Sequence, residues 1–182
     1  SPPCLFLVNG IGISMRETII HTDKIYEGRV VNLSVHQVRL PNDALSKREV
    51  IKHPGAVAIV ALDDQQHVVL VRQYRLPADQ ILYELPAGTL DPDETPEACA
   101  IREMQEETGY KPLTITPMGG IYTAPGYTTE FIHLFFTDSL VPSSLEPDDD
   151  EFVEVVSVPL AQALAMIESG EIADGTLLFD RK

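Results

Sequence analysis

Three glutamates near the middle of the chain have the spacing and the chemistry of a metal site. Glu103, Glu106 and Glu107 are spaced i, i+3, i+4, so a helix would place them on one face. That face lies opposite the apolar residues of the same segment. Carboxylate oxygens grouped in this way suit a hard divalent cation such as Mg²⁺ or Mn²⁺.

A solvated helix face is the ordinary alternative for such an acidic group. Like charges four residues apart destabilise a helix, and within residues 95–108 no Lys or Arg follows four residues on to offset them. Arg102 is the only base between residues 95 and 108. This imbalance of charge favours the metal interpretation.

The helix expected at residues 95–108 has clear ends, and a patterned loop precedes it. Thr95 is a good N-cap and Gly109 is well placed to end the helix. From Gly88 to Tyr110 the residues read Gly-x5-Glu-x7-Arg-Glu-Met-x-Glu-Glu-x-Gly-Tyr. This segment resembles the 23-residue Nudix box at every defining position. The last position, usually aliphatic, is Tyr110 and departs mildly from the pattern.

The resemblance implies both a fold and a chemistry. Nudix proteins are α/β/α sandwiches around a mixed sheet, and they hydrolyse a nucleoside diphosphate linked to another moiety. By this resemblance two or more Mg²⁺ or Mn²⁺ ions are held by Glu103, Glu106 and Glu107, with the Ala87 carbonyl as a further ligand. Such ions would neutralise an anionic pyrophosphate, lower the pKa of a bound water and clamp the reacting oxygens.

Other residues of the box are expected to support this site. Gly88, Glu94 and Arg102 match the supporting positions of the family. Arg102 would pair with its acidic neighbours and fix the loop on the helix. Glu94 would then stabilise the site without being a ligand.

Segments outside the box narrow the resemblance to the ADP-ribose pyrophosphatase group. They are residues 46–58, residues 71–75 and Pro125, which lies fifteen residues past the box. The resemblance covers residues 17–173. It implies hydrolysis of ADP-ribose to AMP and ribose 5-phosphate. Another nucleoside diphosphate sugar as substrate, or a sensor that binds such a ligand without turnover, remains an alternative.

The same group suggests residues that contact the substrate. Arg48 and Arg75 are candidates for the phosphates and ribose, because Arg is well shaped for phosphate. Glu130 is expected to reach the ligand, and Tyr26 is a candidate wall for the adenine. Each charged member of this set would equally suit a structural salt bridge.

An acidic run at residues 148–151 is the candidate source of the general base. The ordinary interpretation is a solvated loop. In the resembling enzymes a glutamate on this loop deprotonates the attacking water. The usual pattern has Glu where this chain has Asp149, and Glu again at Glu151, so the base stays open between the two, with Glu151 favoured. Glu106, already an expected metal ligand, is also a candidate catalytic residue.

The order of the expected elements predicts an α/β fold with three regions. Residues 1–14 form an N-terminal extension, with Met15 as a candidate natural start. Residues 15–53 contain only strands and predict a three-stranded antiparallel sheet, which would be marginal alone. In the resembling group these strands exchange with a second subunit, so a homodimer is expected. Residues 54–182 form the catalytic domain.

Strands and helices alternate along the catalytic region. Residues 56–62 and 67–73 predict a hairpin around residues 63–66. A second helix follows Pro159 and ends near Gly170, with Leu160, Leu164 and Ile167 on one face. Strands, one helix, strands and one helix indicate a mixed sheet with helices packed on it.

The amino-acid composition excludes some classes of binding partner. The formal net charge is −15, which argues against binding to nucleic-acid phosphates or to an anionic membrane. Most of the excess acid lies in two segments, residues 84–107 and 146–154. Two cysteines are too few for a disulfide framework, so a reducing cytoplasm is expected.

Overall fold

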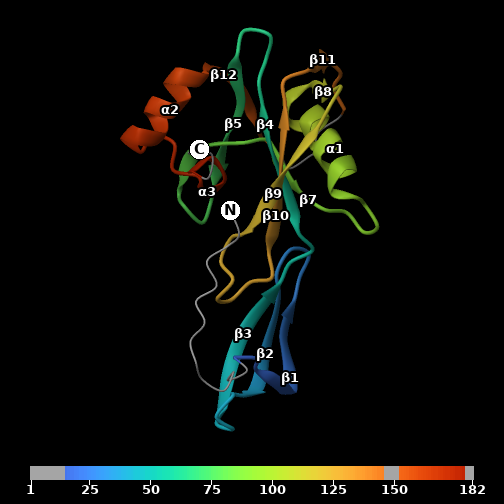
Figure 1. Cartoon of the computed structure of the whole chain (residues 1–182), viewed down its shortest axis with the longest axis vertical. Coiled ribbons are helices and arrows are strands. Elements are labelled where there is room, and N and C mark those ends of the chain that lie inside the picture. The colour runs from blue at the N-terminus through green and yellow to red at the C-terminus, as the bar shows by residue number, and fades with distance from the viewer. Residues whose placement is uncertain (1–14, 146–151, 179–182) are drawn as a thin grey trace, which may run out of the picture. The chain divides into compact units, whose positions relative to one another are not determined.

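The structure of the protein is a computed structural model that describes residues 15–145 and 152–178. The chain divides into two compact units, Ser1–Lys52 and His53–Lys182, which are described separately (Figure 1). Among the described residues, no helix has the length and apolar character needed to cross a bilayer. The roles assigned to the domains from the sequence remain predictions.

The N-terminal unit is the expected three-stranded antiparallel sheet. Its strands are β1 (Thr18–Glu27), β2 (Asn32–Arg39) and β3 (Leu45–Lys52), in the order β1-β2-β3. In the turn between β2 and β3, Asp43 has a φ of 64°, a region that Asp enters more readily than most residues. Every residue of β1 is exposed in the single chain, so its apolar side chains are uncovered.

The C-terminal unit holds the predicted mixed sheet. In its described part, one sheet has the order β7-β4-β10-β9, with β4 and β10 parallel and the other pairs antiparallel. A second sheet, β12-β5-β6, is antiparallel, and β11 pairs with β8. The strands are β4 (Ala56–Ala61), β5 (His67–Arg75), β6 (Gln80–Glu84), β7 (Ala87–Thr89), β8 (Tyr110–Pro112), β9 (Thr116–Tyr122), β10 (Phe131–Thr137), β11 (Leu140–Pro142) and β12 (Glu154–Pro159).

The predicted hairpin between β4 and β5 is much shorter than expected. The expected turn is present, and in it the Gln66 N–H donates to the Asp63 carbonyl at 2.9 Å. Beyond the single bridge between Leu62 and Val68, however, the two strands part into different sheets. Strand β4 and residues 68–71 of β5 are almost wholly buried, so these parts need neighbours on both sides and both faces. Periodicity alone could not reveal this separation.

Helices cover opposite faces of these strands, which confirms the α/β/α arrangement. Helix α1 (Pro96–Thr108) and helix α2 (Leu160–Ser169) lie on either side of the strands in Figure 1, and a short α3 (Gly175–Leu178) follows. Successive side chains of a strand point to opposite faces. Accordingly Val57 and Ile59 of β4 share a buried cluster with Met104 of α1, whereas Ala58 belongs to the cluster that holds Met166 of α2.

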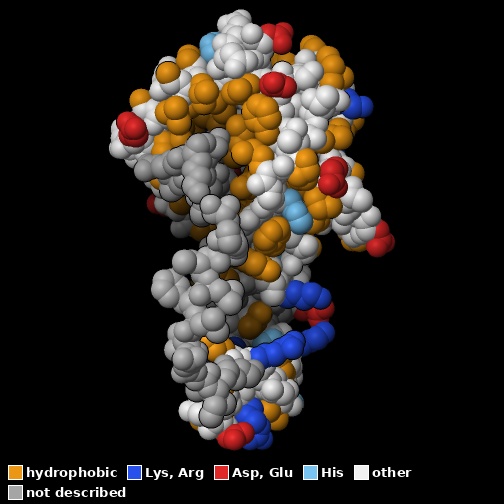
Figure 2. Space-filling model, in the orientation of Figure 1, with side chains coloured by type: hydrophobic (Ala, Val, Ile, Leu, Met, Phe, Trp, Pro, Cys, Tyr) orange, Lys and Arg blue, Asp and Glu red, His pale blue; other side chains and the backbone are white. Residues whose placement is uncertain are grey.

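Of the three residues predicted to share one face of α2, Ile167 packs against the core, whereas the two leucines do not face it. Ala163 and Met166 are buried, while Leu160 and Leu164 are 42% and 45% exposed. Figure 2 shows hydrophobic side chains at the surface over this part of the unit. Because the helix carries apolar residues on more than one side, periodicity did not identify which side would face the sheet.

The start of α1 offers a first test. The Thr95 hydroxyl accepts a hydrogen bond from the Ala98 N–H at 3.2 Å, which satisfies one of the free donors of the first turn. We expect Thr95→Ala to lower the free energy of unfolding by about 1 kcal/mol, measured by urea denaturation. Thr95→Ser keeps the hydroxyl and should remain close to the unaltered protein. Equal stabilities of Thr95→Ala and Thr95→Ser would contradict the assigned cap.

Candidate active site

Helix α1 presents its carboxylates to the interior of the unit. Glu103 and Glu107 are each 7% exposed, and the Glu106 side chain is 22% exposed. These values exclude a solvated face for Glu103 and Glu107. Buried carboxylates require charge partners or hydrogen-bond donors, so their surroundings determine what the helix can do.

The loop before α1 folds back onto the carboxylates. Strand β7 begins at Ala87, whose N–H donates to Glu107 Oε2 at 2.9 Å. A Cβ at Gly88 would overlap the carboxylate of Glu103. The glycine of the box therefore leaves room for the Glu103 carboxylate in its present position, with no contribution from an unusual φ.

Arg102 is the cation at the centre of this acidic group. Its Nη1 donates to Glu103 Oε1 at 2.7 Å and to Glu106 Oε2 at 2.8 Å. Its Nε and Nη2 donate to the two oxygens of Glu94 at 3.0 and 2.9 Å. A further bond from Nη2 reaches the Thr89 carbonyl at 3.3 Å. One guanidinium thus ties the helix to the loop that precedes it.

This pairing shifts the titration of Glu94. Hydrogen bonds from Arg102 lower the pKa of the Glu94 carboxyl from 4.5 to about 2, and the Asp91 N–H adds to the effect. The same bonds raise the pKa of Arg102 above its usual value. Both groups therefore stay charged throughout the neutral range. These contacts agree with the supporting roles predicted for Gly88, Glu94 and Arg102, whose part in catalysis remains a prediction.

The donor set fits a hard divalent cation. Three carboxylates and the Ala87 carbonyl supply only oxygen atoms, which Mg²⁺ and Mn²⁺ prefer. Within residues 15–145 and 152–178, no group of three or more His, Cys, Asp or Glu side chains is arranged closely enough to hold an ion. Arg102 Nη1 instead bridges Glu103 and Glu106. Arg102 thus engages one oxygen of each of these two carboxylates.

A cavity of about 480 Å³ opens beside the box. Ala87, one of the predicted metal ligands, and Gly88 of the box form part of its wall. Its polar side chains come from separate elements and are Arg75, Glu84, Thr123, Glu130, Asp174 and Thr176. Arg75 is the only cation among them, so an anionic ligand would need further positive charge here.

Two of the predicted substrate residues, Arg75 and Glu130, are in this cavity, and each is held by a neighbour. Arg75 Nε and Nη2 donate to the two oxygens of Glu84 at 2.8 and 2.6 Å. Glu130 Oε2 accepts from the Thr123 hydroxyl at 2.6 Å, and its Oε1 lies 3.6 Å from His53 Nε2. Hydrogen bonding to Glu84 raises the pKa of Arg75, so this guanidinium is charged at any working pH.

The other predicted residues belong to the N-terminal unit or lie outside the described residues. Arg48 lies on β3 of the N-terminal unit and pairs with Glu17 at 2.5 Å. Tyr26 lies on β1 and is 60% exposed. Asp149 and Glu151, the candidate bases, lie outside the described residues. Their roles stay predictions.

Sequence reasoning missed several cavity residues. Thr123, Asp174 and Thr176 belong to segments that suggested no site residue, and Glu84 was given no role of its own. Glu84 did offer one signal, because it is a charged residue at the end of an apolar strand and directly before the Leu-Pro-Ala-Gly segment. The others reach the cavity only through the path of the chain.

A match to a protein-family model identifies the family to which both the fold and the box belong. The NUDIX domain model matches residues 52–178, which is most of the chain. The protein belongs to the Nudix family. This membership confirms the fold class and the enzyme class expected from the box.

The relatives of this Nudix protein include an ADP-ribose pyrophosphatase and a GDP-mannose pyrophosphatase. It is 43% identical over 163 residues to the ADP-ribose pyrophosphatase of Bacillus subtilis (strain 168), with 88% of each chain covered. It is 39% identical over 155 residues to the GDP-mannose pyrophosphatase of Citrobacter koseri, covering 79% of this chain and 81% of the relative. A crystal structure of an ADP compounds hydrolase superposes with a TM-score of 0.80 at 25% identity, covering 90% of this chain and 89% of the other.

The ion pair between Glu94 and Arg102 gives the second prediction. Because the pKa of Glu94 is lowered by folding, its stabilisation is present above about pH 4.5 and is lost as the pH falls towards 2. We expect Glu94→Gln to cost on the order of 2 kcal/mol at pH 6, measured by urea denaturation, and progressively less below pH 4.5.

The matched control is Glu97→Gln, which removes an exposed carboxylate from the first turn of the same helix. Its effect should stay within about 0.5 kcal/mol at each pH. A Glu94→Gln cost that is constant from pH 6 to pH 3 would show that the ion pair does not supply the stabilisation.

Proposed function

We propose that this Nudix hydrolase cleaves the pyrophosphate bond of ADP-ribose, in the presence of Mg²⁺, to give AMP and ribose 5-phosphate. The carrying observation is the cavity that joins the box to Arg75 and Glu130. One wall offers oxygen donors for divalent cations, and another offers a guanidinium for phosphate. The similarity to an ADP-ribose pyrophosphatase over most of the chain supports this choice of substrate.

The proposed chemistry divides the work among residues of this chain. Glu103, Glu106, Glu107 and the Ala87 carbonyl would hold Mg²⁺ or Mn²⁺, in two or more ions. These ions supply charge neutralisation at the pyrophosphate and activation of water. Arg75 would bind a phosphate and Glu130 a hydroxyl of the ligand. Glu151, or Asp149 in its place, would accept the proton of the attacking water.

A second candidate is hydrolysis of another nucleoside diphosphate sugar. The similarity to a GDP-mannose pyrophosphatase is the observation that favours it. The box is shared by both activities, so discrimination must come from residues that contact the base and the sugar. A panel of ADP-ribose, other ADP-sugars, GDP-mannose and nucleoside triphosphates therefore separates the candidates.

The third prediction concerns the carboxylates of α1. We expect ADP-ribose hydrolysis to require Mg²⁺, with AMP and ribose 5-phosphate as products identified by chromatography. Glu106→Gln and Glu107→Gln should each reduce turnover about a hundredfold or more, because an amide is a poor ligand for these cations. Circular dichroism should show an intact fold.

The control is again Glu97→Gln, an exposed residue of the same helix, which should retain turnover. Full activity of both Glu106→Gln and Glu107→Gln would contradict the proposed metal ligands. Preference for a nucleoside triphosphate over ADP-ribose would contradict the proposed substrate. Binding of ADP-ribose without turnover in Mg²⁺ would favour the sensor alternative.

The fourth prediction is a homodimer. In the single chain, β1 is exposed along its whole length, including Ile19 and Ile25, at 59% and 58% exposure. Exposed apolar side chains in a row are typical of an interaction surface. Light scattering after gel filtration should give twice the chain mass, and a purely monomeric species would contradict this assembly.

A cytoplasmic location also remains an expectation, drawn from the small number of cysteines.

A further inference from the structure

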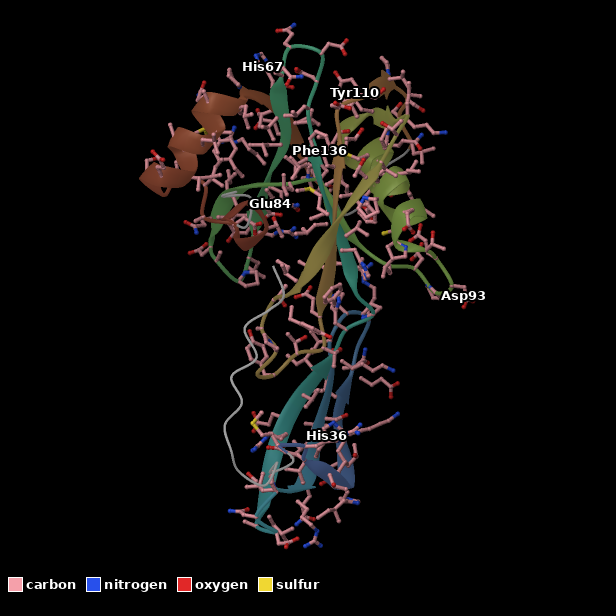
Figure 3. All side chains as sticks on the ribbon, viewed as in Figure 1. His36, His67, Glu84, Asp93, Tyr110 and Phe136 are labelled. Atoms are coloured by element: carbon pink, nitrogen blue, oxygen red, sulfur yellow. The ribbon has the colours of Figure 1, made fainter. Side chains whose placement is uncertain are left out.

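A buried carboxylate at the end of β6 controls how the cavity's guanidinium is held. The Glu84 side chain is 8% exposed, whereas the Arg75 side chain is 47% exposed. The two form a bidentate pair, with Nε to Oε1 at 2.8 Å and Nη2 to Oε2 at 2.6 Å. Gln73 Nε2 adds a weaker bond to Glu84 Oε2 at 3.3 Å. Glu84, labelled in Figure 3, is the last residue of β6.

The strand register explains this geometry. In the antiparallel pair of β5 and β6, Val71 is opposite Glu84 and Arg75 is opposite Gln80. Residues two apart on a strand share a face, so Arg75 and Glu84 lie on the same face but at different positions along it. The long Arg75 side chain must therefore run back along β5 to reach the carboxylate. Its direction is fixed by Glu84 and not by its own backbone position.

The pairing also selects which N–H groups remain for a ligand. A guanidinium has five N–H donors in a fixed plane. Glu84 engages the Nε–H and one N–H of Nη2, which leaves the second N–H of Nη2 and both N–H groups of Nη1. The remaining N–H of Nη2 and one N–H of Nη1 are parallel along one edge, which suits bidentate binding of two phosphate oxygens, whereas the other N–H of Nη1 points back towards Cδ. A carboxylate behind the guanidinium can thus present that edge without touching the ligand.

We propose that Glu84 is a positioning residue that orients Arg75 for the pyrophosphate of the substrate. This inference rests on the proposed function, because it requires a substrate with a pyrophosphate in this cavity. Glu84 is assigned no contact with the substrate and no metal. Its effect passes through the guanidinium of Arg75.

The direction in which Glu84→Gln changes KM distinguishes a positioning role from an effect of the Glu84 charge alone. Glu84→Gln removes a negative charge from a cavity that already contains Glu130 and Asp174. If Glu84 acted by its charge alone, the loss would favour an anionic substrate and lower KM. If Glu84 orients Arg75, the amide loses one of the two acceptors that fix the guanidinium, and KM rises.

The fifth prediction compares the effect of a substitution on KM with its effect on kcat. With ADP-ribose and Mg²⁺, we expect Glu84→Gln to raise KM on the order of tenfold and to change kcat by less than about twofold. The reason is that a phosphate contact present in both the ground and transition states affects mainly KM. Arg75→Lys, which keeps the charge but cannot form two parallel pairs, should raise KM similarly.

The matched control is a second arginine–glutamate pair that involves β5 but does not line the cavity. Arg72 Nη1 donates to Glu154 Oε2 at 2.7 Å. Glu154→Gln also removes a carboxylate acceptor from an arginine of that strand, yet it should leave KM and kcat unchanged.

A double-mutant cycle tests whether Glu84 acts through Arg75. In the Arg75→Ala background, Glu84→Gln should cause no further rise in KM, because the group it orients is absent. Arg75→Ala also leaves a buried carboxylate without its cation, so its Tm should fall. Adding Glu84→Gln should recover part of that loss. Independent, multiplicative effects on KM would overturn the positioning role.

The outcomes distinguish this inference from the proposed function. Hydrolysis of ADP-ribose with an unchanged or lowered KM for Glu84→Gln would overturn the inference alone. Absence of nucleotide-sugar hydrolysis by the unaltered protein would overturn the proposed function and the inference with it. If Glu84→Gln failed to fold, Arg75→Lys would decide, since a KM equal to that of the unaltered protein would overturn the inference.

Discussion

Close packing of carboxylates against a single guanidinium is the constraint on which the site depends. Arg102 contacts Glu94, Glu103 and Glu106 and so neutralises charges that burial would otherwise make very costly. The bonds to Glu94 and the Thr89 carbonyl join the helix to its preceding loop. Without that cation, the acidic face of α1 would repel itself and the loop would lose its anchor. The need for these charged residues at fixed positions of the box therefore has an electrostatic origin.

The same constraint explains the local sequence around the helix. Gly88 allows β7 to approach Glu103, and the Ala87 N–H satisfies Glu107. The apolar side of α1 is meanwhile fixed by burial of Met104 against β4. Carboxylates on one side and core residues on the other leave the helix little freedom to rotate. The helix and β7 thus hold the candidate ligands in fixed positions, with Ala87 in the wall of the cavity and bonded to Glu107.

Much of this arrangement could be predicted from the sequence because local rules govern it. Thr95 and Gly109 delimit α1 through capping, and both ends agree with the structure. Residues that depend on chain topology were harder to foresee. The parting of β4 and β5 into separate sheets, and the arrival of Asp174 in the cavity, follow from long-range packing that no periodicity encodes. Glu84 was overlooked for a related reason, since its importance lies in a register between strands.

Two arginine–carboxylate groups in one small region perform different physical tasks. Arg102 is 27% exposed at its side chain and has three carboxylates within hydrogen-bonding distance, so little of its capacity is left for a ligand. Arg75 is 47% exposed, and its bidentate bonds go to one carboxylate on one edge. The first pattern stabilises a buried acidic group, while the second leaves a directed edge open for an anion. Burial and the number of bonded edges, more than residue type, thus determine which arginine can bind substrate.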